Sequence, residues 1–409
     1  MTSGIHIRRL KGDDDFIAAT RTFRTAMLGL PDPGPLDAAF VARTFEPGRT
    51  FGAFEGDNLV GTVDSYSGWL AVPGGARVRQ AAVTHVGVAP THTRRGILSR
   101  LIAAQLADIR AAGEVVANLR ASDARIYGRF GYAVAGRSAR IVVERERARL
   151  RQGAEGRGAV RLLPAADAFD IIAAVYERVA GRTRPGAIAR SPYWWTLNRG
   201  FLQRAGGPAY VALYGAPGRE EGFARYHPVG HDTWFTGRER TVIVSDLVAA
   251  TPQAHSGLVS FLLSLDLPHR LVFASLPEDD ALPWLLEDSR AATVEAVGDE
   301  TWLRLTDVAG ALSGRRFGAG EPVILAVKDA LLPDNDGLYR VASDGVQRLA
   351  SGAAEAVVDI ATLSAVYLGG VRWWQLAAAG RVTGADADTI ARLDRLFASE
   401  RQPHSGTIF

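Results

Sequence analysis

Residues 84–98 combine the side chains and spacing of an anion-binding turn. The first five have the β-branched content of a strand, and apolar residues then recur at helical spacing until Gly113. The first turn of such a helix offers unpaired N–H groups and a positive dipole end, Gly96 admits a ligand to the main chain, and Arg94 and Arg95 add charge. The pattern predicts a diphosphate cradle. The alternative is an ordinary strand-to-helix turn with two solvated arginines.

The elements that must hold this turn form a mixed α/β pattern. Strands are expected over residues 5–10, 51–55, 59–66, 69–72, 78–88, 115–119 and 133–143, and helices over 13–27, 37–43 and 98–112. A breaker is expected at 31–35, and 144–157 has the charged, glycine-rich composition of a linker. Towards the C-terminus, strands are expected over 322–329, 338–341 and 356–360, and helices over 362–368, 371–379 and 389–399. The pattern predicts several α/β units in succession.

The turn also resembles motif A of the GNAT acetyltransferases, in which a strand V-x-V-x-P precedes Q/R-x-x-G-x-G/A. Residues 86–90 match the strand and Gly96 matches the first glycine, whereas Thr93 stands where Gln or Arg is usual and Leu98 replaces the second small residue. In that family the loop holds the pyrophosphate of acetyl-CoA. A dinucleotide-binding site would need G-x-G-x-x-G directly after a strand, and that pattern is absent here.

A second motif narrows the resemblance. Residues 121–132 read A-S-x-x-x-I-Y-G-R-F-G-Y, and the sequence ends in Phe409. Together with the length of 409 residues, this chain is similar to the Eis (enhanced intracellular survival) family over its whole extent. The resemblance implies an α/β (α+β) chain with a catalytic GNAT domain at 1–150, a degenerate GNAT-like domain at 151–305 and a sterol-carrier-protein-like domain at 306–409. It also implies a homo-oligomer, a hexamer in that family.

The resemblance assigns roles to individual residues. Tyr127 matches the general acid of the family, and Phe409 matches the residue whose free α-carboxylate is the general base. Contacts to acetyl-CoA are expected at Val86, Gly87, Val88, Arg94, Arg95, Gly96, Ile97, Leu98, Ser99, Ser122 and Asp123. Without the resemblance, Tyr127 is interpreted as a packed core tyrosine and Phe409 as a frayed apolar tail.

Phe23 and His85 are the residues expected to contact the acceptor amine. If Val86 points into the core, strand alternation turns His85 towards the acceptor, where it could line the pocket or act as a base. A satisfied strand histidine is the alternative. Eis members that acetylate aminoglycosides carry acidic residues in this pocket, but here Ile408 precedes the last residue and segment 23–26 lacks a carboxylate. An aminoglycoside, a small amine and a peptide lysine all remain open as acceptors.

Other parts of the chain favour alternatives to catalysis. Residues 250–257 occupy the place of a second motif A but lack Arg-Arg-Gly, which predicts a duplicated fold without cofactor binding. Tyr193-Trp194-Trp195 is interpreted as core rather than as an exposed patch. The last domain could carry a lipid, although any small α+β domain needs an apolar interior, and we favour an architectural role. A non-catalytic acetyl-CoA-binding scaffold and a lipid carrier are the competing functions.

Composition limits which other classes of protein the chain could belong to. The net charge is +3, but basic residues are spread along the chain and only two are lysines, so no nucleic-acid-binding stripe is expected. No cysteine is present, which excludes disulfides and thiolate catalysis. His227 and His231 have metal-like spacing, but Pro228 and Gly230 mark a turn, so no metal is expected. With no apolar run of 18 residues and no signal-peptide core, the expectation is a cytoplasmic protein without a membrane span, and secretion stays open.

Overall fold

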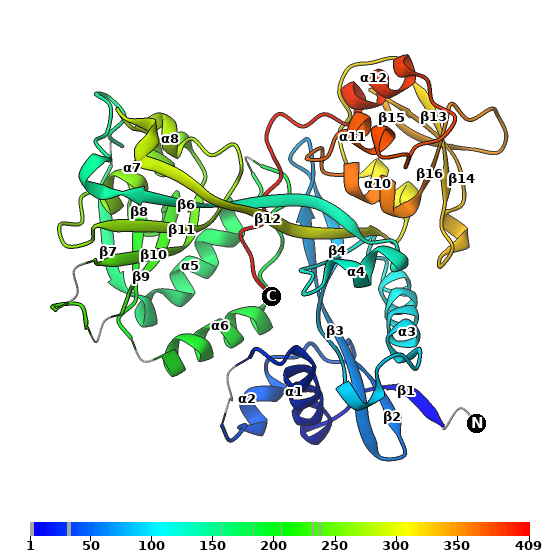
Figure 1. Ribbon diagram of the computed structural model, residues 1–409, viewed down its shortest axis with the longest axis horizontal. Helices are drawn as coiled ribbons and strands as arrows, with labels where there is room; N and C mark the ends of the chain where they lie inside the picture. Colours follow the sequence, from blue (N-terminus) through cyan, green and yellow to red (C-terminus); the bar gives the residue numbers. More distant parts are fainter. Residues whose placement is uncertain are drawn as a thin grey trace.

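The computed structural model describes residues 4–30, 34–156, 158–182, 184–205, 207–230, 233–236 and 239–409 (Figure 1). Part of the expected breaker at 31–35, Arg157 of the expected linker and His231 lie outside these residues. Within them, the mixed α/β class expected from the sequence is confirmed. None of the described helices is long and apolar enough to cross a membrane.

The first part of the chain forms β1 to β6 and α1 to α4. The strands are Ile5–Arg9, Phe51–Glu55, Asn58–Ala71, Arg77–Val88, Val116–Leu119 and Ala133–Glu144. The helices are Asp13–Met27, Ala38–Ala42, Ile97–Ala111 and Ala124–Tyr127. The two strands expected at 59–66 and 69–72 are one continuous strand, β3, because it pairs with β4 as far as Ala71.

The central and C-terminal parts follow the same layered plan. Strands β7 to β12 are Val160–Pro164, Tyr210–Tyr214, Gly222–Val229, Thr241–Ala249, Arg270–Leu276 and Ala292–Leu305, and helices α5 to α8 are Ala165–Val179, Pro192–Ala205, Pro252–Leu263 and Leu282–Leu285. Strands β13 to β16 are Val323–Lys328, Gly337–Ala342, Gly345–Leu349 and Ala356–Asp359, and helices α9 to α12 are Val308–Ser313, Ile360–Val366, Trp373–Ala378 and Ala387–Leu396. The polar edge strand β15 was not expected, because its side chains give no apolar alternation.

Two long strands join the first two units into one sheet. The described strand order is β1-β2-β3-β4-β5-β12-β6-β11-β10-β9-β8-β7, so β12 returns from the central unit to pair with β5. Strand β6 pairs with β12 along its length and with β11 at its far end (Figure 1). Residue 150 lies in the connection after β6 and residue 305 is the last of β12, and the sheet is continuous across both units.

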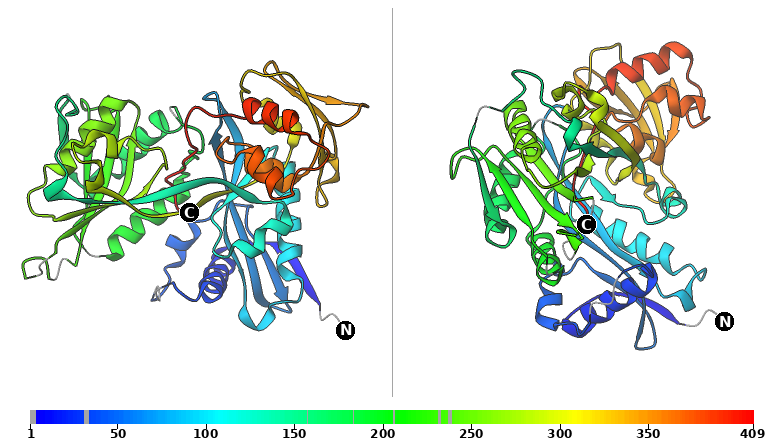
Figure 2. Two further views of the ribbon diagram at one scale, coloured as in Figure 1. Left: turned by 45° about the horizontal axis from the view of Figure 1, so that its top comes forward. Right: turned by 60° about the vertical axis from the view of Figure 1, so that its left-hand side comes forward.

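The C-terminal unit packs against the N-terminal half of this sheet (Figure 2). Its own four strands are ordered β15-β14-β13-β16. The interior is filled by large, fully buried side chains, including Trp373, Tyr367 and Phe397. These share one apolar cluster with Leu70 of β3 and Leu303 of β12. The C-terminal unit is therefore fastened to the sheet by a common core.

Candidate active site

Strands β4 and β5 separate next to the motif A turn. They pair in parallel only where Gln80–Ala82 faces Val116–Asn118, whereas β3 continues to pair with the other edge of β4 as far as Val88. Beyond Ala82, the β5-facing edge of β4 therefore has no strand partner in the described sheet. An extended ligand could form main-chain hydrogen bonds along this edge.

A β-bulge interrupts β4 within the opening. Asp64 pairs with Thr84 and Thr62 pairs with Gly87, so two residues of β4 lie opposite Val63 alone. His85 lies in this bulge with φ of 48°, in the left-handed region that non-glycine residues rarely adopt. The bulge bends the strand at the point where its edge becomes free.

The two faces of β4 carry different side chains. Val86 and Val88 pack with the core beneath α3. His85 instead contacts Phe23 of α1, with ring centroids 5.0 Å apart, and Phe45, at 4.9 Å. A Cβ added to Gly87 would lie 3.2 Å from the Phe23 Cα, so α1 crosses this strand closely. The alternation expected for Val86 and His85 is confirmed, and Phe23 and His85 lie together.

The turn into α3 leaves the helix start open. Arg94 and Gly96 both have left-handed φ values, 62° and 74°, and α3 begins at Ile97 with no side-chain cap. The first N–H groups, from Ile97, Leu98 and Ser99, are therefore not capped by a side chain. A Cβ at Gly96 would meet nothing within 4 Å, so the space above the turn is free.

The two arginines of the turn have different surroundings. Arg95 pairs with Glu55 of β2 at 2.7 Å, and His92 reaches the same carboxylate at 3.0 Å. Arg94 is exposed. One arginine is therefore tied to the sheet, and the other stands at the surface beside the open helix start.

Helix α4 positions Tyr127. Asp123 caps the helix by accepting the N–H of Arg125 at 2.9 Å, and its ion pair with Arg125 holds the pKa of that carboxyl down to about 2. Ser122 is exposed beside it. Tyr127 is buried, and burial raises the pKa of its phenol to about 12, so the hydroxyl stays protonated at neutral pH. Its ring packs against Tyr132, with centroids 6.0 Å apart.

The C-terminal tail, residues 401–409, passes between the first two units (Figure 1). On the sheet side, Glu300 of β12 accepts the N–H groups of Ser405, at 2.7 Å, and Gly406, at 3.0 Å. Arg120 pairs with Glu300 at 2.8 Å and donates to the Thr407 carbonyl at 2.9 Å. Burial tends to raise the Glu300 pKa, but His404, Arg120 and the two N–H donors outweigh it and keep that pKa below its usual value.

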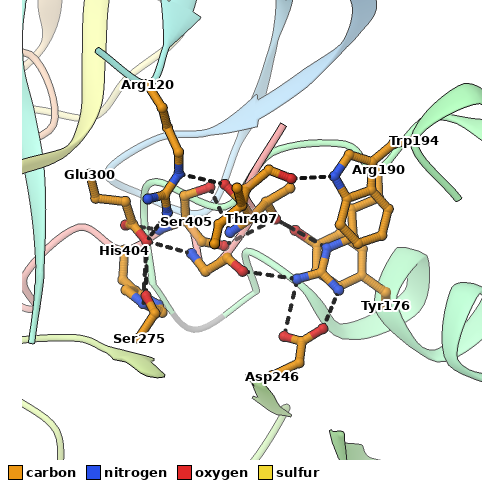
Figure 3. A network of polar contacts seen from close by, with 12 residues as sticks. Arg120, Tyr176, Arg190, Trp194, Asp246, Ser275, Glu300, His404, Ser405 and Thr407 are labelled. Atoms are coloured by element: carbon orange, nitrogen blue, oxygen red, sulfur yellow. Dashed lines mark hydrogen bonds and ion pairs between the residues drawn. The ribbon is translucent and has the colours of Figure 1, made fainter. Parts of the chain in front are cut away.

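The central unit holds the other side of the tail (Figure 3). Arg190 lies over the Tyr176 ring and forms a fully buried ion pair with Asp246 at 2.5 Å. It also donates to the Thr407 hydroxyl at 3.1 Å and to the Gly406 carbonyl at 3.2 Å. Trp194 donates its indole N–H to the Ile408 carbonyl at 2.6 Å. We call these contacts, together with those of Arg120 and Glu300, the tail clamp.

Sequence reasoning missed most of the clamp. Trp194 is buried, as expected, but its bond to the tail was not foreseen. Arg120 lies next to the 121–132 motif, and that position was its only signal. Arg190, Asp246 and Glu300 carry no local pattern, because their partners are distant in the chain. Phe409 itself is half-buried and, like Tyr193, packs against the apolar cluster that contains Tyr66, rather than fraying.

The corresponding helix start in the central unit is closed. Thr251 caps α7 by accepting the N–H of Ala254 at 3.1 Å, and Pro252 takes the first helical position, where it has no N–H. Glu221 accepts the Thr251 hydroxyl at 3.0 Å, which places a carboxylate beside the helix start. A Cβ at Gly257 would lie 2.3 Å from the Tyr214 ring, so the first turns are tightly covered.

The central unit keeps a cavity of about 410 Å³ beside this closed helix start. Strand β10, α7, the end of β11 and tail residues 401 and 404–406 line it. His255 lies in it with its Nε2 3.1 Å from the Asp280 carboxylate. His227, on β9, lines a second cavity, and burial lowers its pKa. No group of three or more metal-ligating side chains occurs among the described residues.

Family models match all three units. Residues 6–135 and 186–305 match acetyltransferase (GNAT) domains, and residues 308–406 match a sterol carrier protein domain. The fold and these matches define a GNAT N-acetyltransferase with two GNAT domains followed by a sterol-carrier-like domain. A GNAT domain uses an acyl-CoA as the donor of the acyl group.

Whole-chain relatives identify the family. An uncharacterized N-acetyltransferase of Streptomyces coelicolor is 36% identical over 97% of each chain, and N-acetyltransferase Eis of Mycobacterium bovis is 34% identical over 90% of this chain and 88% of its own. The crystal structure of Eis1 from Mycobacterium abscessus aligns with a TM-score of 0.92 at 43% identity, covering 99% of this chain and all of that one. The chain belongs to the Eis family of GNAT N-acetyltransferases.

Proposed function

We propose that this enzyme transfers acetyl from acetyl-CoA to a primary amine. Residues 1–150 are the catalytic domain, 151–305 a domain that has lost cofactor binding, and 306–409 an architectural domain whose tail completes the site. The observation that carries the proposal is the tail clamp, which fixes residues 405–408 through buried charged groups of both GNAT domains.

The acetyl-CoA site follows from the open edge of β4 and the uncapped start of α3. Main-chain groups of Val86–Val88 would hold the acetyl and pantetheine groups, and the N–H groups of residues 96–99 with Arg94 would hold the pyrophosphate. Arg95 would contribute from its ion pair with Glu55. Ser122 and Asp123 lie at the neighbouring strand end, on the other side of the opening. When bound, acetyl-CoA supplies the acetyl group as a thioester.

Tyr127 is proposed as the general acid that protonates the departing thiolate. A phenol whose pKa is raised to about 12 by burial keeps its proton at neutral pH and is available to donate it. Asp123 fixes the start of the four-residue helix that carries Tyr127.

The α-carboxylate of Phe409 is proposed as the general base for the attacking amine. An α-carboxyl group ordinarily titrates at about pH 3.3 to 3.7, so its carboxylate is a weak base and must act at short range. The tail clamp provides such positioning, because Arg120, which is partly buried, holds the carbonyl of Thr407 and the buried Trp194 indole holds that of Ile408.

Extending the chain by one residue tests this base. One residue moves the carboxylate by roughly 3.3 to 3.6 Å, whereas a base must lie within about 2.6 to 3.2 Å of the proton or of a bridging water. A C-terminal glycine, an amide cap or deletion of Phe409 is expected to abolish acetyl transfer while acetyl-CoA binding persists. An N-terminal tag is the matched control. Native turnover by the extended chain would place the base elsewhere.

The acceptor is proposed to be a small amine or a lysine, with aminoglycosides less favoured. Ile408, whose side chain is 68% exposed next to Phe409, and Arg24 on α1 offer no carboxylate to a polycation. A panel of amines, with the released thiol detected, ranks these classes. Family resemblance alone supports a homo-oligomer, which is a hexamer in other members. Analytical sedimentation measures the oligomeric state.

A further inference from the structure

His85 and Asp64 form a buried dyad on the acceptor side of β4. The Asp64 carboxylate is fully buried, and its two oxygens meet the Thr50 hydroxyl at 2.8 Å and His85 Nδ1 at 3.2 Å. A carboxylate accepts hydrogen bonds, so this contact assigns the proton to Nδ1 and leaves the lone pair on Nε2. The His85 side chain is 12% exposed, so its ring is not fully enclosed.

The backbone holds this imidazole at a special position. His85 lies in the β-bulge at left-handed φ, beside the open edge of β4. Strained conformations of this kind gather at functional sites. Phe23 and Phe45 pack against the ring and fix its plane.

The dyad shares one face of β3 with the contacts of the tail. Asp64 and Tyr66 are two residues apart on a regular stretch of β3, so they point to the same side. Tyr66 stacks on Tyr193, and both Tyr193 and Phe409 pack against the cluster that contains Tyr66. The imidazole and the chain end therefore belong to one side of the sheet.

An ammonium acceptor must lose two protons during the reaction, and this requires more than one proton transfer to a base. R–NH₃⁺ must lose one proton before its nitrogen can attack the thioester, and the nitrogen must lose a second after the C–N bond forms. As the C–S bond breaks, the thiolate takes one proton from Tyr127. The net reaction releases one proton to solvent.

We propose that His85, oriented by Asp64, accepts the first of these protons at Nε2 and passes it to solvent. The inference rests on the proposed acetyl transfer, in which the Phe409 carboxylate takes the second proton. Histidine suits the first step, because it changes charge between pH 5 and 8. Asp64 is a positioning residue, since it acts through the imidazole.

Charged residues lie in, or directly beside, the segments that contact the imidazole: Asp64 itself, Arg24 after Phe23 and Glu46 after Phe45. Asp64 from β3 is in contact, and Arg24 follows Phe23 on α1. Glu46, after α2, accepts the Ser67 N–H at 2.7 Å, and Tyr66 donates its hydroxyl to the Thr44 carbonyl at 2.8 Å. Asp64 is therefore the carboxylate in direct contact with the ring.

Two acceptor amines distinguish removal of the first proton from removal of the second. The probes are a primary alkylamine, whose ammonium has a pKa near that of lysine at about 10.4, and an arylamine that is neutral at pH 7. His85→Gln is expected to lower kcat/KM for the alkylamine about 10²-fold at pH 7 and to leave the arylamine within about threefold. The alkylamine defect shrinks as the pH approaches the ammonium pKa.

Asp64→Asn provides a second readout. It is expected to lower kcat/KM for the alkylamine about tenfold and to leave the arylamine within about threefold, because the imidazole loses the carboxylate that orients it. His6→Gln, on the exposed strand β1, is the matched histidine control. Should His85→Gln fail to fold, His85→Phe fills the space between the two phenylalanines.

The outcomes distinguish this inference from the proposed function. Equal losses for both acceptors at every pH, or no loss at all, overturn the role of His85. The C-terminal extension is expected to impair both acceptors, and its failure to do so overturns the Phe409 base alone. Independently of activity, ¹⁵N chemical shifts of the His85 ring are expected to show the Nδ1–H tautomer, and the Nε2–H form contradicts the dyad.

Discussion

The two GNAT domains have the same strand–turn–helix design but treat the helix start in opposite ways. Helix α3 begins after the left-handed Gly96 with no cap, beside Arg94 and Arg95. Helix α7 begins with Thr251 bound to its own first turn and Glu221 close by. An uncapped start attracts an anion, whereas a capped start next to a carboxylate repels one. The proposed loss of cofactor binding in the central domain therefore needs only ordinary capping chemistry and no change of fold.

The central domain retains a different task. Its buried ion pair between Arg190 and Asp246 and the Trp194 indole hold the tail. In the proposed function, the first GNAT domain binds the cofactor and the second places the chain end. Mutations in the first GNAT domain and mutations in the second are therefore expected to have different consequences.

The largest effect is expected from Tyr127→Phe. It tests whether proton donation in the first domain, and not a tyrosine of the second, sets the rate of acetyl transfer. The variant keeps the ring packed against Tyr132 and loses the proton donor, so single-turnover acetyl transfer should fall by about 10² to 10⁴. Tyr210→Phe, on β8 of the central domain, is the control and should retain the native rate. An unchanged rate for Tyr127→Phe assigns that residue to packing.

Breaking the ion pair of the central domain comes next. Arg190→Gln leaves Asp246 buried without its partner, and the free energy of unfolding should fall by about 3 to 5 kcal/mol. The double variant Arg190→Met with Asp246→Leu removes both charges and should recover most of that stability, while the tail loses two donors. Thermal unfolding and acetyl-CoA binding should then be near native, with acetyl transfer reduced. Native transfer by the double variant would show that the clamp is dispensable.

Removing the arginines of the turn is expected to have a smaller effect. Arg94→Ala with Arg95→Ala should weaken acetyl-CoA binding about tenfold, which corresponds to about 1.4 kcal/mol for charged contacts near the surface. Gln253→Ala, in the first turn of α7, should leave affinity unchanged. Calorimetry should give one acetyl-CoA site per chain, and two equivalent sites would contradict the expected difference between the two GNAT domains.

The smallest effect concerns alkaline stability. The folded-state pKa of Tyr127 is raised to about 12, above an unfolded value of about 10, so folding favours the protonated phenol. Its contribution is complete below pH 10 and declines as the pH rises towards 12. Between pH 9 and 11 the wild type should lose about 1 kcal/mol more unfolding free energy than Tyr127→Phe. Denaturant titrations at the two pH values measure this difference.

Local patterns were sufficient for most elements of the first GNAT domain. The expected helix at residues 13–27 matches α1, and the expected hairpin at 51–66 is β2 with the first part of β3. These elements follow from apolar periodicity, turn residues and a run of aspartates at a helix start, all of which act over a few residues. Strand β15 was missed because a polar edge strand lacks that periodicity.

The sequence by itself determined the motif A turn and the alternation that separates His85 from Val86. Each depends on backbone preferences and side-chain spacing within about a dozen residues. The return of β12 into the first sheet, the pairing of Asp64 with His85 and the clamp on the tail depended on tertiary structure. Arg120 and Thr407 are 287 residues apart in the chain. A buried charge has no sequence signature of its own, because the partner that permits its burial is chosen only when the chain folds.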